Sequence, residues 1–426
     1  MNKVRKILLQ EKFTKFVIYG IGQGFNLISP LLVIPYIVYI CGESGYGKVN
    51  LGFSMALFLI LIVDYGFEIK APKEISESRD NPVKLQEIAN TTFYSKFIIF
   101  LLVFFCINIL VQCIPFLYNE RLLYIFSSTI ILAQVFSPSW FLQGLENFKI
   151  VSIINIASKV TYVVLVYVVL KNSKDYIYVN LLLGLSALLF NLGFLIYAVK
   201  KYNINLWKPN LGNIKTAIVI DFSLCVSQLF LSARQLSPTF IISAFLGYNA
   251  AGQYAIIERI IGMFRTFIQV FLRFFFPTVC YKISKDITDG FSFWKKYTGY
   301  GMILMTTGTA ILYIFSLNVL LYFNLSVHDA VVLNPIFRIA LLIPLVMSFS
   351  YPLEQLMFVV NKHKVYVKII MSLALVTVVL SLTGVKSYGV ISIVLSLLVS
   401  EIIIAVLYFK YSYHYLKKVQ LSNNKL

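Results

Sequence analysis

The chain has 426 residues, of which 59% are hydrophobic and 13% are charged, and its 37 Lys and Arg against 18 Asp and Glu give a formal net charge of +19. Soluble domains hold roughly 45–50% apolar and about 25% charged residues, so this composition excludes a soluble multidomain enzyme and predicts an integral membrane protein. At about 20 apolar residues per spanning helix, the apolar content allows on the order of twelve spans.

Apolar runs follow one another along the chain and predict an all-α membrane protein with twelve transmembrane helices. The first six runs lie near residues 16–40, 49–69, 97–118, 122–144, 150–170 and 176–199. The second six lie near residues 217–246, 252–280, 298–323, 330–360, 365–384 and 388–409. The longest polar connections lie near 70–96, 200–216 and 281–297, which leaves no room for an extramembrane catalytic domain.

The distribution of Lys and Arg over the connections predicts the orientation. With the N-terminus inside, the cytoplasmic segments hold 25 basic residues and the opposite side holds 5. Cytoplasmic loops carry the excess of basic residues in membrane proteins, so we predict a multi-pass inner-membrane protein with both termini in the cytoplasm. The basic start precedes an apolar run that is too long for a secretory signal, and it predicts an uncleaved first helix.

Glycines at matching positions indicate that the chain contains two copies of one unit. Gly42 at the end of the first span and Gly247 at the end of the seventh open similar segments, and Pro72 and Pro277 share the same offset. Six spans separate the copies, which predicts a parallel repeat of two six-helix halves around a central cavity, as in secondary transporters. We place the halves at 1–199 and 217–409, with a basic linker at 200–216 and a basic tail at 410–426.

The segment at Gly42 also has the Gly-x4-Gly-Lys spacing of a phosphate-binding loop. Val49 stands where that loop needs Ser or Thr to hold magnesium, and a membrane helix precedes the segment instead of a strand. A tight turn between two helices is therefore the favoured interpretation.

Seven basic residues lie inside the predicted spans, where each one costs roughly 2.5–3.5 kcal/mol at the centre of a helix. Lys368 lies close enough to the cytoplasmic end to reach the interface. The other six are Lys159, Arg234, Arg259, Arg265, Arg273 and Arg338.

The eighth span places polar residues on one helical stripe. Glu258, Gly262, Arg265, Gln269 and Arg273 recur at spacings of three or four residues. The structural alternative is that the bases form buried pairs with acids, namely Asp221, Glu258, Glu354 and Glu401. For Arg259 and Lys159, such a structural role and a ligand-binding role are evenly balanced. Four acids cannot neutralise six or seven bases, so we expect Arg234, Arg265 and Arg273 to face a cavity, where guanidinium groups suit the oxygens of a phosphorylated ligand.

Two motifs in the first half resemble a known family. Asp64-Tyr65-Gly66-Phe67 and Pro138-Ser139-Trp140-Phe141-Leu142-Gln143-Gly144-Leu145-Glu146 are similar to motifs of the Wzx-type polysaccharide flippases in the multidrug/oligosaccharidyl-lipid/polysaccharide exporter superfamily. The second motif is the more specific one. The structural alternative is that its polar and aromatic residues anchor a helix end at the membrane interface, and it applies to Trp140, Gln143 and Glu146.

The resemblance implies a flippase that moves undecaprenyl-pyrophosphate-linked oligosaccharide from the cytoplasmic to the outer leaflet by alternating access. Membrane lipids, a polysaccharide polymerase and a chain-length regulator are the partners it implies, and nucleic acid is not among them. The intramembrane bases and Gln269 would then bind pyrophosphate and sugar. The candidates for coupling to a proton or sodium gradient, or for gating, are Asp64, Glu258 and Glu354. For Asp64, the alternative is an ion pair with a loop lysine.

The five scattered cysteines and three histidines indicate no metal site or disulfide framework, and we expect no bound cofactor. Three other functions stay open. A lipid II-type flippase would usually be expected to have fourteen spans, and twelve are predicted here. A drug or metabolite antiporter of the same superfamily would not depend on the arginines. A polysaccharide polymerase, which is an enzyme, would be expected to carry a large external loop, and none is predicted.

Overall fold

The computed structural model describes residues 2–206, 210–359 and 363–423. Over these ranges every regular element is a helix, which confirms the predicted fold class. The chain divides into two compact units, Met1–Ser232 and Ala233–Leu426. The division falls inside helix α9 (Leu211–Phe245), so it lies beyond the connection at 200–216 where the sequence placed it.

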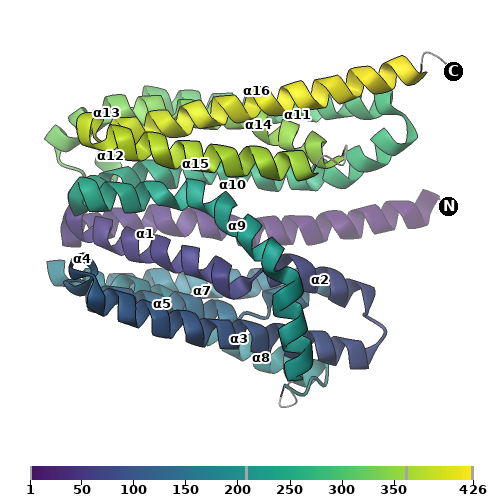
Figure 1. Cartoon of the computed structure of the whole chain (residues 1–426), viewed down its shortest axis with the longest axis horizontal. Helices are drawn as coiled ribbons and strands as arrows, with labels where there is room; N and C mark the ends of the chain where they lie inside the picture. Colours follow the sequence, from purple (N-terminus) through teal and green to yellow (C-terminus); the bar gives the residue numbers. More distant parts are fainter. Residues whose placement is uncertain (1, 207–209, 360–362, 424–426) are drawn as a thin grey trace. The chain divides into compact units, whose positions relative to one another are not determined.

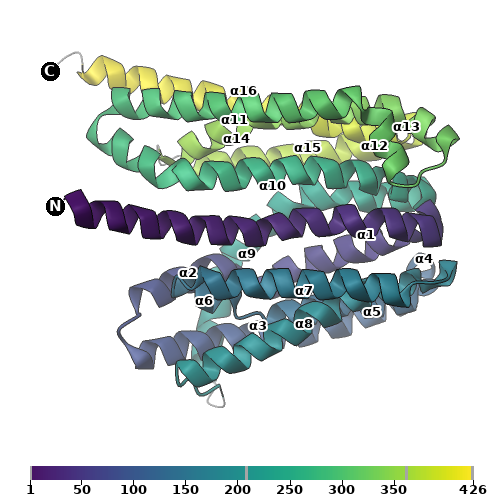
Figure 2. The same cartoon turned by 180° about the vertical axis from the view of Figure 1, so that it is seen from behind.

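The N-terminal unit is a bundle of helices that pack along their lengths (Figure 2). Within it, α5 packs on α8, α7 packs on both α1 and α8, and α1 also contacts α5. The described elements are α1 (Asn2–Asp64), α2 (Phe67–Glu77), α3 (Pro82–Cys113), α4 (Pro115–Tyr118), α5 (Arg121–Val135), α6 (Ser139–Gly144), α7 (Phe148–Val169), a 3₁₀ turn (Ser173–Asp175), α8 (Tyr176–Lys201) and the first part of α9.

The C-terminal unit is a second bundle, in which α16 packs along α14 and α15 and α10 packs on α11 (Figure 1). Its elements after α9 are α10 (Gly247–Lys285), α11 (Ile287–Ile314), α12 (Ser316–Tyr322), α13 (Val327–Ala340), α14 (Leu342–Val359), α15 (His363–Tyr388) and α16 (Val390–Asn423). α16 therefore continues through most of the segment that the sequence assigned to a separate tail.

Both matched glycines take the backbone conformation that a turn between two helices needs. Gly42 has φ 73° and interrupts the helical geometry of α1, and Gly247 has φ 84° at the junction of α9 and α10. Left-handed φ values carry no Cβ penalty in glycine. The tight turn predicted at Gly42 is confirmed, and because the surrounding residues are helical they form no phosphate-binding loop.

Eight helical segments of the described chain are apolar and long enough to cross a membrane, or nine if α11 and α12, bent by 76°, count as one span. α1 is counted once among the eight although Gly42 divides it into the first two predicted spans. The long helices α9 and α10, which hold Arg234, Arg259 and Arg265, are not in this set. These counts agree with a multi-pass membrane protein.

One predicted boundary is wrong. Residues 70–96 were expected to be a polar connection, but α2 ends at Glu77 and α3 begins at Pro82. Asn81 caps α3 by accepting a hydrogen bond from the Lys84 backbone N–H at 3.1 Å, and Pro82 occupies the first helical turn. An Asn cap followed by Pro is a strong signal for the start of a helix. The early start places Lys96 inside the bundle, so an additional buried base joins the seven that the sequence suggested.

Candidate functional site

The Asp-Tyr-Gly-Phe motif breaks the chain between α1 and α2 and holds two acids beside a buried lysine. Tyr65 and Gly66 have φ of 50° and 89°, which ends α1 at Asp64 and starts α2 at Phe67. The Lys96 ammonium lies 2.8 Å from an Asp64 oxygen and 2.6 Å from a Glu68 oxygen. Lys96 is fully buried, so these two acids replace the water that its charge loses.

Gln134 of α5 links this charged group to its surroundings. Its amide nitrogen donates to Asp64 and to Glu68, both at 3.2 Å. The sequence offered a loop lysine as the partner of Asp64, and the actual partner is a lysine in the middle of α3. Two carboxylates around one ammonium leave a net negative charge in the group if both are ionised.

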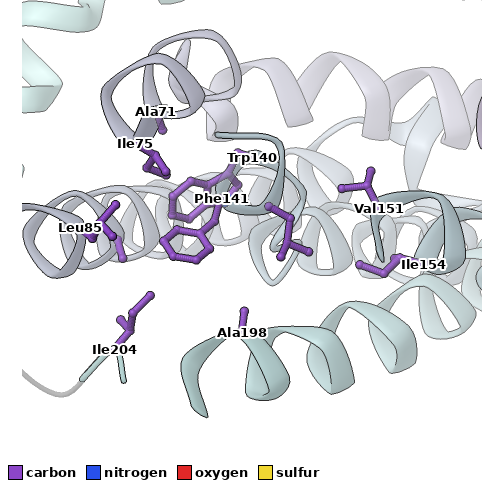
Figure 3. Packing of buried hydrophobic residues seen from close by; sticks show 11 residues of the cluster. Ala71, Ile75, Leu85, Trp140, Phe141, Val151, Ile154, Ala198 and Ile204 are labelled. Atoms are coloured by element: carbon purple, nitrogen blue, oxygen red, sulfur yellow. The ribbon is translucent and has the colours of Figure 1, made fainter. Parts of the chain in front are cut away.

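The second motif packs α6 against α2, as Figure 3 shows. Trp140 and Phe141 are each 3% exposed and belong to a core cluster with Ala71 and Ile75 of α2. The alternative in which Trp140 anchors a helix end at the membrane interface is therefore not supported. A Cβ added at Gly144 would lie 2.7 Å from Ile75, so the motif needs glycine at this contact.

The end of the same motif is fixed by Arg79. Its guanidinium donates to the Gly144 carbonyl at 3.1 Å and to Glu146 at 2.9 Å. Glu146 itself has φ 56°, an unusual value for a residue with a side chain. The role of Glu146 in this structure is thus to hold the α6 turn to the end of α2.

A cavity of about 300 Å³ lies inside the N-terminal unit, and polar side chains dominate its lining. It brings together two residues that the sequence singled out, Gln143 of the motif and Lys159 of α7. The other polar lining residues are Asn26, Gln134, Ser137, Ser139, Asn155, Ser158, Ser186 and Asn191. Because Gln134 lines the cavity and also binds Asp64 and Glu68, the cavity and the charged group share a residue.

Arg234 in the C-terminal unit has a carboxylate partner. Its guanidinium forms an ion pair with Glu401 of α16, and Ser350 of α14 donates a hydrogen bond to the same carboxylate. The Glu401 side chain is 3% exposed and that of Arg234 is 13% exposed. The expectation that Arg234 faces a cavity without a partner is therefore corrected, although its Nε is buried without a hydrogen bond.

Arg265 on α10 has a neutral partner. One of its terminal nitrogens donates to the Gln235 side chain at 3.1 Å, and its Nε is buried without a partner. No ion pair of Arg265 is present in the described ranges. Glu258, about two helical turns earlier, accepts a hydrogen bond from Thr239 at 3.2 Å and interacts with the Arg265 charge at longer range. Gln269 is exposed, while the side chain of Arg273 lies outside the described residues.

The remaining predicted residues are dispersed over the C-terminal unit. Arg338 donates to Ser316 at 3.0 Å and lies over the Tyr313 ring, and Arg259 is half-buried on α10. Glu354 accepts a hydrogen bond from Tyr366 at 3.0 Å. Asp221, offered as a partner for the buried arginines, instead binds Lys70 of α2 at 2.8 Å within the N-terminal unit.

Sequence reasoning missed Lys96, Glu68 and most of the cavity. Asn155, Ser158 and Lys159 are spaced as one face of a helix, and Ser186 and Asn191 follow on the next helix, so a search for polar faces in the fifth and sixth spans could have found them. In the part of the chain that the structure describes, no three His, Cys, Asp or Glu side chains gather as a metal site requires.

Comparison with known proteins connects these motifs to a family. The family model described as polysaccharide biosynthesis protein matches residues 13–280, more than half of the chain. The chain belongs to the polysaccharide biosynthesis protein family. The predicted resemblance to polysaccharide exporters is thereby confirmed, and both motifs lie within the matched residues.

Two curated relatives of this polysaccharide biosynthesis protein are described as candidate O-antigen transporters. The one from Escherichia coli K12 is 22% identical over 240 residues, covering 56% of this chain and 58% of its own. The one from Shigella dysenteriae is 28% identical over 225 residues, covering 51% of each chain. The matches thus span little more than half the length of these relatives.

Solved structures show the fold of the whole chain. The inward-facing structure of a multidrug resistance MATE family transporter of the MOP superfamily has a TM-score of 0.73 at 12% identity, covering 93% of this chain and 94% of that one. A MOP superfamily transporter from Pyrococcus furiosus has a TM-score of 0.65 at 13% identity and 95% coverage of each chain. At such low identity the likeness shows a shared fold.

Proposed function

We propose that this protein is a flippase that moves undecaprenyl-pyrophosphate-linked oligosaccharide from the cytoplasmic to the outer leaflet of a bacterial inner membrane. Its family and the names of its relatives support a role in polysaccharide export, and its fold is one that transporters use. The excess of basic residues on one side of the predicted spans supports cytoplasmic termini. In this proposal the two halves alternate access to the substrate.

The proposal depends most on Arg265, whose charge has no acidic partner within hydrogen-bonding distance among the described residues. This arginine lies on the polar stripe of α10, has a neutral glutamine as its hydrogen-bond partner and forms no ion pair among the described residues. A charge in a membrane is costly unless it has a function or a partner. A pyrophosphate would supply the missing negative charge, and a guanidinium can bind two phosphate oxygens at once.

Other arginines of the C-terminal unit would support Arg265 in this role. Arg259, Arg273 and Arg338 add positive charge to the same unit, and Gln269 offers an exposed amide on the α10 stripe. Arg234 can contribute its unpaired Nε while its other end stays bound to Glu401. Lys159, which the sequence grouped with these arginines, lines the cavity of the N-terminal unit.

The energy for transport would come from an ion gradient acting on a buried carboxylate. Asp64 lies in a group with two acids and one base, and Glu258 and Glu354 have hydroxyl groups of Thr239 and Tyr366 as hydrogen-bond donors. A carboxylate that exchanges its proton when access changes would couple transport to the proton gradient. Sodium would serve the same purpose if it displaced the proton.

The test is polysaccharide export in cells that depend on this protein. A hydrogen bond to a charged group contributes about 1.5–3 kcal/mol, so Arg265→Ala should reduce export about 10- to 150-fold at equal expression. Arg121→Ala, which removes an exposed arginine bonded to Tyr118, is the matched control and should have little effect. Undiminished export in Arg265→Ala cells would refute the assignment of Arg265. If the purified protein instead transported drugs and ignored Arg265, an antiporter would be indicated.

A further inference from the structure

The cavity of the N-terminal unit has the size and the position of a ligand subsite. Its volume of about 300 Å³ is at the small end of the range for ligand pockets, which suits one ring-sized group. Its walls come from α1, α5, α7 and α8, together with the α6 motif through Gln143. Water at roughly 30 Å³ per molecule can also occupy such a polar cavity, and a ligand would displace it.

The lining offers both hydrogen-bond acceptors and hydrogen-bond donors to a ligand. Ser158 and Ser186 donate their hydroxyl hydrogens to the carbonyls of Asn155 and Leu183, and Ser137 donates to Ser139. The amide of Gln134 donates to Asp64 and Glu68, and that of Asn191 donates to the Ala133 carbonyl at 2.7 Å. A serine hydroxyl has one donor and two acceptor lone pairs, so these five residues face a ligand mainly as acceptors. The side-chain amides of Gln143 and Asn155 can donate as well as accept.

A pyrophosphate fits such a lining poorly, because it carries several negative charges and cannot donate to the acceptor groups. The lining contains one base, Lys159, and the carboxylates of Asp64 and Glu68 lie directly behind Gln134. A sugar ring fits better, since each hydroxyl donates a hydrogen bond and the ring is uncharged. The alkyl walls at Val151 and Ile154 can pack against the apolar face of such a ring.

We infer that this cavity binds one uncharged, hydroxylated sugar ring of the glycan. The inference rests on the proposed function, and it separates two tasks that the sequence had combined in one site. The cavity of the N-terminal unit selects the sugar, while the arginines of the C-terminal unit bind the pyrophosphate. Lys159 is thereby assigned to the sugar, and the glutamine of the family motif, Gln143, becomes a residue that contacts the substrate.

Two lipids distinguish these tasks in a binding experiment on the full-length protein in nanodiscs. The probes are undecaprenyl pyrophosphate and undecaprenyl-pyrophosphate-linked N-acetylglucosamine, and the reading is the dissociation constant of each. We expect the sugar to tighten binding at least about tenfold in the wild type. Asn155→Ala and Gln143→Ala should each weaken binding of the sugar-bearing lipid about three- to tenfold, as the loss of a hydrogen bond predicts. Both variants should leave the bare lipid within twofold.

Thr161→Ala is the matched control, because Thr161 lies on the same helix and does not line the cavity. Arg265→Ala should weaken both lipids equally. If Asn155→Ala weakened the bare lipid as much as the sugar-bearing one, or if the sugar added no affinity in the wild type, the sugar subsite would be refuted while the flippase proposal stood. If neither lipid bound the wild type, the proposed function itself would fail.

Discussion

Replacing Lys96 with methionine removes the one base of a buried charged group. The variant Lys96→Met keeps the length of the side chain and leaves Asp64 and Glu68 without the ammonium that lies 2.8 Å and 2.6 Å from them. Breaking a buried ion pair by removing one partner costs about 3–5 kcal/mol, because the remaining charge stays buried without compensation. The loss applies here mainly through Asp64, which keeps its charge in the variant and whose side chain is 12% exposed, while that of Glu68 is 29% exposed.

The assay is thermal unfolding of the purified protein in detergent. At about 2 °C per kcal/mol for a unit of this size, Lys96→Met should lower the apparent Tm by about 6–10 °C. Lys73→Met is the matched control, because the Lys73–Glu77 pair spans 3.9 Å and its side chains are 76% and 64% exposed. An exposed pair of this kind contributes at most about 1 kcal/mol, so the control should unfold near the wild-type temperature.

A triple variant separates the loss of charge balance from the loss of packing. Lys96→Met combined with Asp64→Asn and Glu68→Gln removes all three charges, and most of the stability should return, since neutral residues of similar volume often replace a buried ion group at little cost. If Lys96→Met unfolded at the wild-type temperature, or if the triple variant were no more stable than Lys96→Met, the electrostatic reasoning would be refuted.

Three further outcomes follow from the geometry. Arg234→Met leaves Glu401 buried without a base and should destabilise the protein by about 3–5 kcal/mol, and adding Glu401→Gln should recover part of this loss. If the wild type, Arg234→Met and the double variant unfolded at the same temperature, the ion pair would be contradicted. Gly144→Ala places a Cβ 2.7 Å from Ile75 and should lower the stability by about 1–3 kcal/mol through overpacking. In the same thermal unfolding assay, Gly193→Ala should cause no comparable loss of stability, because its Cβ meets no atom within 4 Å. Arg79→Ala removes the hydrogen bond to the Gly144 carbonyl and should increase proteolysis near 144–146 in the folded protein, and protection equal to the wild type would count against this contact.

Much of the fold could be predicted because membrane helices leave a direct trace in the sequence. The apolar runs located the helices, and the two matched glycines marked turns that the backbone confirms. The start of α3 was missed because its first turns are polar and were taken as a connection. The Asn81-Pro82 pair carried the opposite signal, and giving it more weight would have placed Lys96 in a helix.

The partners of buried charges were harder to predict, because the residues that pair lie far apart in the chain. Arg234 and Glu401 are separated by 167 positions, and Lys70 and Asp221 by 151. Charge counting showed that some arginines must pair, but it could not say which. The cavity was missed for another reason. The few Asn and Ser residues leave α7 and α8 apolar enough to span a membrane, and only the packing of α1, α5, α7 and α8 brings these polar side chains together.

The central claim is that this protein moves a pyrophosphate-linked glycan across the bilayer, and translocation in proteoliposomes tests it most directly. Full-length protein is reconstituted with undecaprenyl-pyrophosphate-linked N-acetylglucosamine, and the fraction of sugar accessible to an external glycosyltransferase is followed over time. Wild-type protein should equilibrate the lipid between leaflets, Arg265→Ala should slow this by at least about tenfold, and Arg121→Ala should leave the rate unchanged. Equilibration no faster than in protein-free vesicles, or an equal rate with Arg265→Ala, would contradict the claim.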